Sequence, residues 1–215
     1  AQATGAEQDG RRAGCVGDAA AFSFYPTKPL GGYGDGGMIL TSDPDRAARL
    51  RRLRFYGMER TYYAREEGYN SRLDEVHAAV LDLLLPELDA RNAQRRARAA
   101  QYDQELAGLP GLHTPVVAPG NTHIYYVYTI RTTQRDALQT HLARYGIGAQ
   151  VNYPSPIHRM DGYAFLGLRP GALPHTEQVA GEILSLPMFP ELTAEQVARV
   201  AETIRAFVAA GGTDR

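Results

Sequence analysis

One stretch decides the fold expected of this chain: SFYPTKPL, residues Ser23–Leu30. Proline fixes φ and has no backbone N–H, so the two prolines place Lys28 in a turn rather than inside a helix or a strand. The preceding residues, 18–25, are small and aromatic and are typical of a buried strand. A turn directly after a buried strand is well placed to aim a long amine into a pocket.

Lys28 is the single lysine of the chain, beside 22 arginines. Arginine is always protonated and cannot form an imine, whereas a lysine amine can lose its proton when it is desolvated or lies near another cation. Two explanations stay open at this point. Either the chemistry at position 28 requires an amine, or genome composition has left one surface lysine by chance.

The surroundings of Lys28 favour a ligand that carries a phosphate. Ser23 and Thr27 supply hydroxyl groups, and the glycine-rich run GGYGDGG, residues 31–37, permits close backbone approach. Each element alone is weak evidence, because most glycine-rich turns are only turns. Together they suit a phosphate-carrying aldehyde that is bound to the amine as an imine.

The composition excludes several other classes of protein. A formal net charge of -1 argues against a nucleic-acid partner, and no apolar run approaches the roughly 20 residues of a membrane span. The single cysteine, Cys15, cannot form an intramolecular disulfide and fits a reducing, cytoplasmic setting. The N-terminus has no signal-peptide pattern. It begins with Ala1 rather than Met, so we expect the chain to be part of a longer protein.

The first half of the chain predicts helices after residue 42. A start signal at Ser42–Pro44 opens an arginine-rich helix through residue 55, whose charges favour a solvated or intersubunit face over a nucleic-acid stripe. Residues 56–69 are expected to form a loop. Ser71 has capping-box spacing before a helix that Pro86 interrupts, and a second helix should cover 87–106.

The second half predicts a compact α+β unit. Strands are expected at His123–Ile130, the strongest strand signal of the chain, and at 147–153. Helices are expected at 134–145, at 176–184 and at 193–209, the last with a Thr-x-x-Gln cap. Strands with helices on one side are typical of a layered α+β structure.

Several motifs in this order resemble the DegT/DnrJ/EryC1/StrS aminotransferases, and the resemblance covers essentially the whole chain. The motifs are AQATGA from Ala1, GDAAAFSFYPTK ending at Lys28, GDGG from Gly34, GYNSRLDE from Gly68, YPSPIH from Tyr153 and LSLPMFP from Leu184. The resemblance implies the α/β fold of fold-type I transferases that use pyridoxal 5'-phosphate (PLP). It also implies a division into the end of the large PLP-binding domain at 1–85, a connecting helix at 86–110 and a small C-terminal α+β domain at 111–215.

The resemblance assigns roles in cofactor binding position by position. Lys28 matches the lysine that forms the internal aldimine and moves the proton between Cα and C4′. Ser23 matches a phosphate ligand, and Gln2 matches a glutamine near the 3′-oxygen. Asn70 matches a residue that reaches the phosphate in the neighbouring subunit, with Arg72 and Tyr62 as further members of that contact. These assignments imply a homodimer with shared active sites.

The resemblance also places His158, Tyr153 and Asn152 near the sugar substrate. Relatives that act on 3-keto-sugars often carry histidine at the position of Asn152, and asparagine can hydrogen-bond a hydroxyl but cannot titrate near neutral pH. Simpler roles stay open. His158 can order a loop, Ser23 can cap a turn, and Asn70 can precede a helix. The aspartate that pairs with the pyridinium nitrogen in the family lies before Ala1, outside this chain.

The function implied is a ping-pong transamination from an amino acid, most often L-glutamate, to a nucleotide-linked keto-sugar, in particular a dTDP-3-keto-6-deoxyhexose. A keto-cyclitol acceptor is an alternative within the family. A non-catalytic PLP-binding partner or regulatory fragment is an alternative from another class. A sugar dehydratase is disfavoured, because those relatives replace the lysine with histidine.

Overall fold

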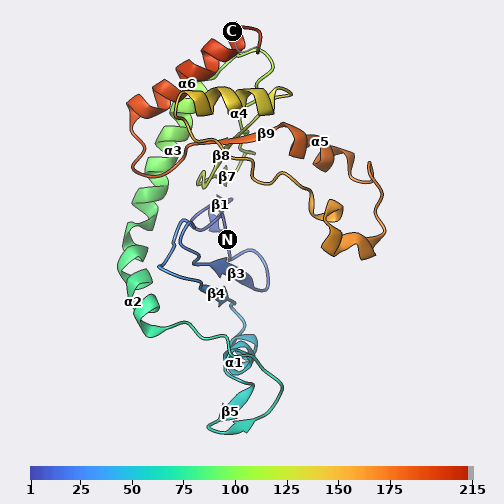
Figure 1. Ribbon diagram of the computed structural model, residues 1–215. Helices are drawn as coiled ribbons and strands as arrows, with labels where there is room; N and C mark the ends of the chain where they lie inside the picture. The colour runs from blue at the N-terminus through green and yellow to red at the C-terminus, as the bar shows by residue number, and fades with distance from the viewer. Residues whose placement is uncertain (213–215) are drawn as a thin grey trace. The chain divides into compact units, whose positions relative to one another are not determined.

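The computed structural model describes residues 1–212 (Figure 1). These residues divide into two compact units. Unit 1 contains Ala1–Ala93 together with the ten-residue segment Val117–Tyr126. Unit 2 contains Gln94–Val116 and the described residues from Val127 onward. Unit 1 is therefore made of two separate stretches of the chain, and so is unit 2.

Unit 1 is built from short antiparallel strands. Strand β1 (Glu7–Gln8) lies between β2 (Arg11–Arg12) and β7 (Asn121–Thr122). Strand β3 (Ala20–Ser23) pairs with β4 (Gly37–Leu40). The predicted strand before Lys28 is thus present, although its side chains are half-buried or exposed. Burial is concentrated just beyond it, in a core cluster of Phe24, Leu30, Leu81 and Leu88.

Helix α1 (Pro44–Leu53) begins where the start signal predicted, at the N-cap Asp43. The Asp43 carboxylate accepts hydrogen bonds from the backbone N–H groups of Asp45 (2.9 Å) and Arg46 (3.0 Å). These bonds, the Arg46 bond first, hold the pKa of Asp43 below its usual range. No residue of α1 is buried, so the helix has little core packing and depends on its cap.

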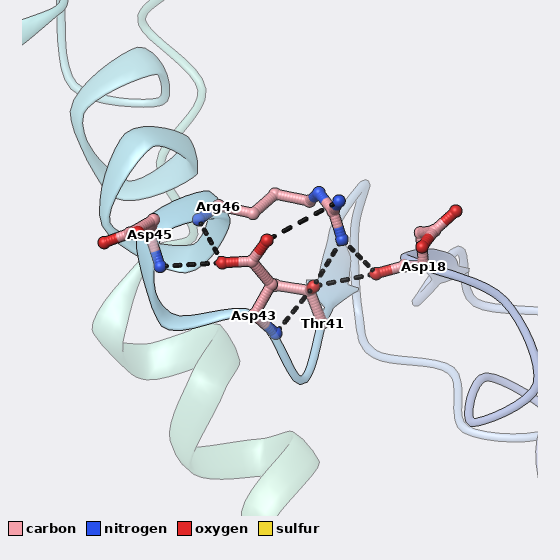
Figure 2. Close-up of polar contacts among 5 residues, drawn as sticks. All are labelled: Asp18, Thr41, Asp43, Asp45 and Arg46. Carbon is pink, nitrogen blue, oxygen red and sulfur yellow. Dashed lines mark hydrogen bonds and ion pairs between the residues drawn. The ribbon is translucent and has the colours of Figure 1, made fainter.

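The start of α1 is also tied to the strands. Figure 2 shows the Arg46 guanidinium reaching from the helix to the backbone oxygen of Asp18, at 2.7 Å, just before β3. The hydroxyl of Thr41, just after β4, donates to the same oxygen at 2.8 Å and accepts from the Asp43 N–H at 3.2 Å. This polar cluster joins the open end of the β3–β4 pair to the helix.

Residues 56–69, predicted as a loop, contain a small hairpin of β5 (Met58–Arg60) and β6 (Tyr63–Ala64). Glu66 anchors it by ion pairs with Arg49 (3.0 Å) and Arg52 (3.1 Å) of α1. The hydrogen bond from Arg49 is the largest cause of a lowered Glu66 pKa. Two of the arginines on α1 therefore hold a neighbouring segment in place.

Helix α2 (Glu75–Leu84) leads through the short 3₁₀ helix η1 (Leu85–Glu87) into α3 (Leu88–Glu105), so the predicted interruption at Pro86 is confirmed. The predicted capping box at Ser71 is wrong. The N-cap is Asp74, and its side chain makes no capping hydrogen bond. The Ser71 N–H instead donates to the Arg54 oxygen at 2.9 Å, which keeps Ser71 in extended pairing before the helix.

Unit 2 is centred on the antiparallel pair β8 (Tyr128–Arg131) and β9 (Ile183–Leu186). Helix α4 (Arg135–Arg144) agrees with its prediction, and helix α6 (Ala194–Ala209) has the predicted capping box of Thr193 and Gln196. Helix α5 (Pro174–Glu182) and the 3₁₀ helices η2 (Ile157–Arg159) and η3 (Asp161–Leu166) complete the unit.

Two strand predictions and one helix prediction in this region need correction. The strand expected at His123–Ile130 survives only as β8, because the residues before it belong to unit 1. The strand expected at 147–153 is reduced to one bridge between Gln150 and Ser185. The helix expected through Leu184 ends at Glu182, because Leu184 to Leu186 are buried in β9 against β8. Within residues 1–212, no helix is long and apolar enough to cross a membrane.

We predict that Asp43→Ala loosens α1, because the helix loses its cap and has no buried face to replace it. Asp43→Asn is the matched control, since asparagine is also a good N-cap. The measurement is hydrogen exchange at the Asp45 and Arg46 amides, which should lose protection in Asp43→Ala and keep most of it in Asp43→Asn. Equal protection in all three proteins would contradict the prediction.

Candidate functional site

The backbone around Lys28 is held by three hydrogen bonds of 2.8 Å. The Lys28 N–H donates to the Tyr25 oxygen and closes a turn over residues 25–28. The Gly32 N–H donates to the Phe24 oxygen, and the Phe24 N–H donates to the Gly36 oxygen. Phe24 and Leu30, on either side of the turn, are buried in the core of unit 1. The turn predicted from the two prolines is therefore anchored at both ends.

The amine of Lys28 lies over an aromatic ring. Its Nζ is 5.0 Å from the centroid of the Tyr126 ring, within the range of a cation–π contact. The Tyr126 hydroxyl is 3.1 Å from the hydroxyl oxygen of Thr27, the residue before Lys28. Within residues 1–212 Lys28 forms no ion pair with a carboxylate.

The glycine-rich run after Lys28 is needed first for packing. A methyl group at Gly32 would overlap the imidazole ring of His77, which projects from α2. A methyl group at Gly36 would press on Leu73 and His77. At Gly32 and Gly36, the absence of a side chain therefore lets the backbone pack closely against residues of α2 and of the segment just before it.

Ser23 lies at the end of β3, and its oxygen accepts a hydrogen bond from the Tyr25 N–H at 3.3 Å. This contact is the turn-capping role that the sequence left open. A serine hydroxyl also carries a proton to donate, so the same side chain can serve both the turn and a phosphate oxygen.

Gln2 is exposed, and the segment that carries it is attached to α3. The buried side chain of Asn92 donates to the Thr4 oxygen at 3.1 Å. Gly5 follows with a φ of +91°, and its position is packed against the Asn92 amide. The sequence does not single out Asn92, because an asparagine inside a charged helix gives no local signal.

Asn70 and Arg72 lie in the segment between β6 and α2, where Asn70 forms a bridge with Phe55, and Tyr62 lies between β5 and β6. The Arg72 Nε donates to the Asn70 Oδ1 at 3.3 Å, and the Arg72 guanidinium lies over the rings of Phe55 and Tyr56 at 5.4 and 6.0 Å. Tyr62 is 94% exposed, in the turn of the β5–β6 hairpin, with a φ of +61°. Asn70 and Arg72 form one group, and Tyr62 projects into solvent.

The predicted sugar-binding residues lie in unit 2. His158 is buried in η2, and its Nε2 is 3.0 Å from the Oε1 of Glu177 on α5. Glu177 also accepts from the N–H groups of Gly171 and Leu173. The geometry supports the alternative in which His158 orders a loop. Tyr153, in the segment before η2, is exposed, and Asn152 is half-buried.

Known proteins match this chain over nearly its whole length. The model of the DegT/DnrJ/EryC1/StrS aminotransferase family matches residues 1–205. A dTDP-3-amino-3,4,6-trideoxy-alpha-D-glucose transaminase of Micromonospora megalomicea subsp. nigra is 52% identical over 97% of this chain and 57% of its own length. A pleiotropic regulatory protein of Geobacillus stearothermophilus is 47% identical over 96% of this chain and 56% of its own length.

Among solved structures, Streptomyces venezuelae DesV in complex with a ketimine intermediate superposes with a TM-score of 0.92 at 45% identity. The match covers 94% of this chain and 55% of DesV. The chain thus spans about half the length of the curated relatives that it matches.

We predict that Gly32→Ala destabilises unit 1 by about 1–3 kcal/mol, a usual cost of overpacking, because the added methyl overlaps His77. Gly34→Ala is the matched control, since a methyl there would meet the His77 ring only at 3.9 Å. Urea unfolding measures both. The double variant Gly32→Ala/His77→Ala should lose less stability than the two single changes added together. Equal destabilisation by Gly32→Ala and Gly34→Ala would refute this account.

We predict that acid loosens the loop between η2 and α5. The hydrogen bond from His158 is the largest cause of a lowered Glu177 pKa. A lowered carboxylate pKa stabilises the fold above the ordinary glutamate value, and that stabilisation is lost as pH falls through the lowered one. Protection of the Gly171 and Leu173 amides should therefore fall as pH drops from about 5 to about 3. Glu177→Gln, which cannot titrate, should show a flat profile.

Proposed function

Because the chain belongs to the DegT/DnrJ/EryC1/StrS aminotransferase family, we propose that it carries the lysine of a PLP-dependent aminotransferase site. The proposed reaction moves an amino group from L-glutamate to a nucleotide-linked keto-sugar. The 52% identical relative is described as a dTDP-3-amino-3,4,6-trideoxy-alpha-D-glucose transaminase. That description supports a dTDP-3-keto-6-deoxyhexose as the acceptor.

The observation that carries the proposal is the placement of Lys28. It is the only lysine of the chain, it is held in a hydrogen-bonded turn, and no carboxylate pairs with its amine within residues 1–212. PLP, when bound, supplies an aldehyde for the amine and a ring that withdraws electrons. Lys28 Nζ would hold the cofactor, and the free amine would accept and return a proton.

The neighbouring residues fit a phosphate-bearing group. The hydroxyl of Ser23 keeps a proton to donate while its oxygen caps the Tyr25 N–H. Gln2, on the segment that Asn92 attaches to α3, is proposed to lie near the 3′-oxygen of the cofactor. Ser23 and Gln2 carry uncharged hydrogen-bond donors, which would bind an anionic ligand and leave Lys28 to supply the amine.

We propose that Asn70, Arg72 and Tyr62 serve the site of a second subunit in a homodimer. Arg72 donates to the Oδ1 of Asn70, so the amide nitrogen of Asn70 remains as a donor for a phosphate oxygen. The stacking of Arg72 on Phe55 and Tyr56 fixes the pair. Tyr62 is exposed, as a residue that reaches a neighbouring subunit must be in one chain alone.

In unit 2, we propose that Tyr153 and Asn152 contact the sugar and that His158 holds their segment through Glu177. Residues 1–85 would then be the end of the large PLP-binding domain, 86–110 the connecting helix and 111–215 the small domain. A cytoplasmic enzyme agrees with the single cysteine.

A second candidate function is supported by one observation. The 47% identical relative is described as a pleiotropic regulatory protein. A PLP-binding protein without transamination would keep the Lys28 turn and the phosphate donors but would not respond to an amino donor. If the protein is an aminotransferase, a keto-cyclitol is the alternative acceptor.

The proposal predicts that PLP gives the protein a near-visible absorption band, that L-glutamate bleaches it, and that Lys28→Arg abolishes it. Arginine keeps the charge but cannot form the bond. A band that persists in Lys28→Arg would overturn the lysine assignment. A band that forms but ignores a panel of amino donors would favour the regulatory alternative. Trials with dTDP-linked keto-sugars and keto-cyclitols then separate the acceptors.

A further inference from the structure

Tyr126 reaches the Lys28 turn through a segment that the chain inserts into unit 1. Residues Val117–Tyr126 belong to unit 1, although the residues on both sides belong to unit 2. Strand β7 in this segment pairs with β1, and the Asp9 N–H donates to the Gly120 oxygen at 2.7 Å. Backbone hydrogen bonds therefore fix the segment whose last residue is Tyr126.

Two contacts determine where the Tyr126 ring lies. Its hydroxyl is 3.1 Å from the Thr27 Oγ1, and its ring centroid is 5.0 Å from the Lys28 Nζ. The two partners are consecutive residues of the same turn, which the Lys28–Tyr25 hydrogen bond closes. The Tyr126 ring is thus held at its hydroxyl by Thr27 and lies under the side chain of Lys28.

A ring suits this position better than a carboxylate would. The face of an aromatic ring attracts an ammonium group, but it carries no net charge. A carboxylate would hold the proton of the amine more strongly and would repel an anionic phosphate nearby. A tyrosine ring can therefore confine a flexible lysine side chain without either effect.

We propose that Tyr126 is a positioning residue that holds the Lys28 amine over its ring whenever that amine is not bonded to a carbonyl carbon. The spatial part of this inference stands on unit 1 alone. Its importance for cofactor attachment rests on the function proposed above. Tyr126 acts through Lys28 and is not itself a catalytic residue.

The position of the amine can be measured without any cofactor. Lys28 is the only lysine of this chain, so in protein labelled with ¹³C-lysine the signals that Lys28→Arg removes belong to Lys28. The ε-methylene signal should be shifted upfield by the ring in the wild type and in Tyr126→Phe. In Tyr126→Leu it should return to the position of a solvated lysine. Tyr33→Leu, which removes an 89% exposed tyrosine, should leave the signal unchanged.

Attachment of PLP gives a second readout that does not depend on turnover. The amine displaces the aldehyde oxygen as water, and borohydride then adds hydride to the C=N bond, which leaves a stable secondary amine on Lys28. At limiting PLP, Tyr126→Leu should form this product about two- to fivefold faster, because it loses the partly exposed cation–π contact that holds the unbonded amine. Tyr126→Phe, which keeps a ring, should change the rate less, and Tyr33→Leu should match the wild type.

The outcomes separate this inference from the proposed function. An unchanged ε-methylene shift and attachment rate in Tyr126→Leu would overturn the positioning role, even if PLP attaches normally. Absence of any attachment in the wild type, with the ring shift present, would overturn the proposed function and leave the positioning role standing. If Tyr126→Leu fails to fold by circular dichroism, Tyr126→Met, which fills similar space without a ring, replaces it.

Discussion

The backbone hydrogen bond from the Gly32 N–H to the Phe24 oxygen closes the loop that carries Lys28. Both ends of this loop are packed against other residues. Phe24 is in the core cluster, and Gly32 lies against the His77 ring of α2. The turn at Lys28 is therefore held at both ends by groups packed in unit 1. Every proposed contact of the amine depends on this loop keeping its shape, and at position 32 glycine fits because a larger residue would overlap the His77 ring.

Carboxylates fix the segments that have little apolar burial. Asp43 caps α1, Glu66 ties the β5–β6 hairpin to that helix, and Glu177 joins η2 to α5 through His158. Each of these carboxylates has a lowered pKa because hydrogen bonds favour its charged form. Arg49, Arg52 and His158 thus hold neighbouring segments in place, and only His158 was expected to lie near a substrate.

The candidate site is assembled from residues that are far apart along the chain. Thr27 and Tyr126 are 99 positions apart and touch through their hydroxyls. Asn92 holds the Thr4 oxygen across 88 positions, and in that way it fixes the segment that carries Gln2. Loop-closure entropy opposes such contacts, and they form here because strand pairing and helix packing bring the segments together. The site is therefore no more stable than the tertiary structure around it.

Local chemistry by itself determined the turn at Lys28, the cap of α1, the interruption at Pro86 and the capping box of α6, because fixed proline φ angles and caps act within a few residues. The family motifs likewise lie in short runs that can be read directly. Tertiary structure alone decided that residues 123–126 are not part of a strand and that Ile183–Leu186 form β9 instead of the end of a helix. It also decided that the Tyr126 ring lies against the Lys28 amine. Those outcomes depend on which distant segment supplies a hydrogen-bonding partner or a ring, and no local pattern encodes that choice.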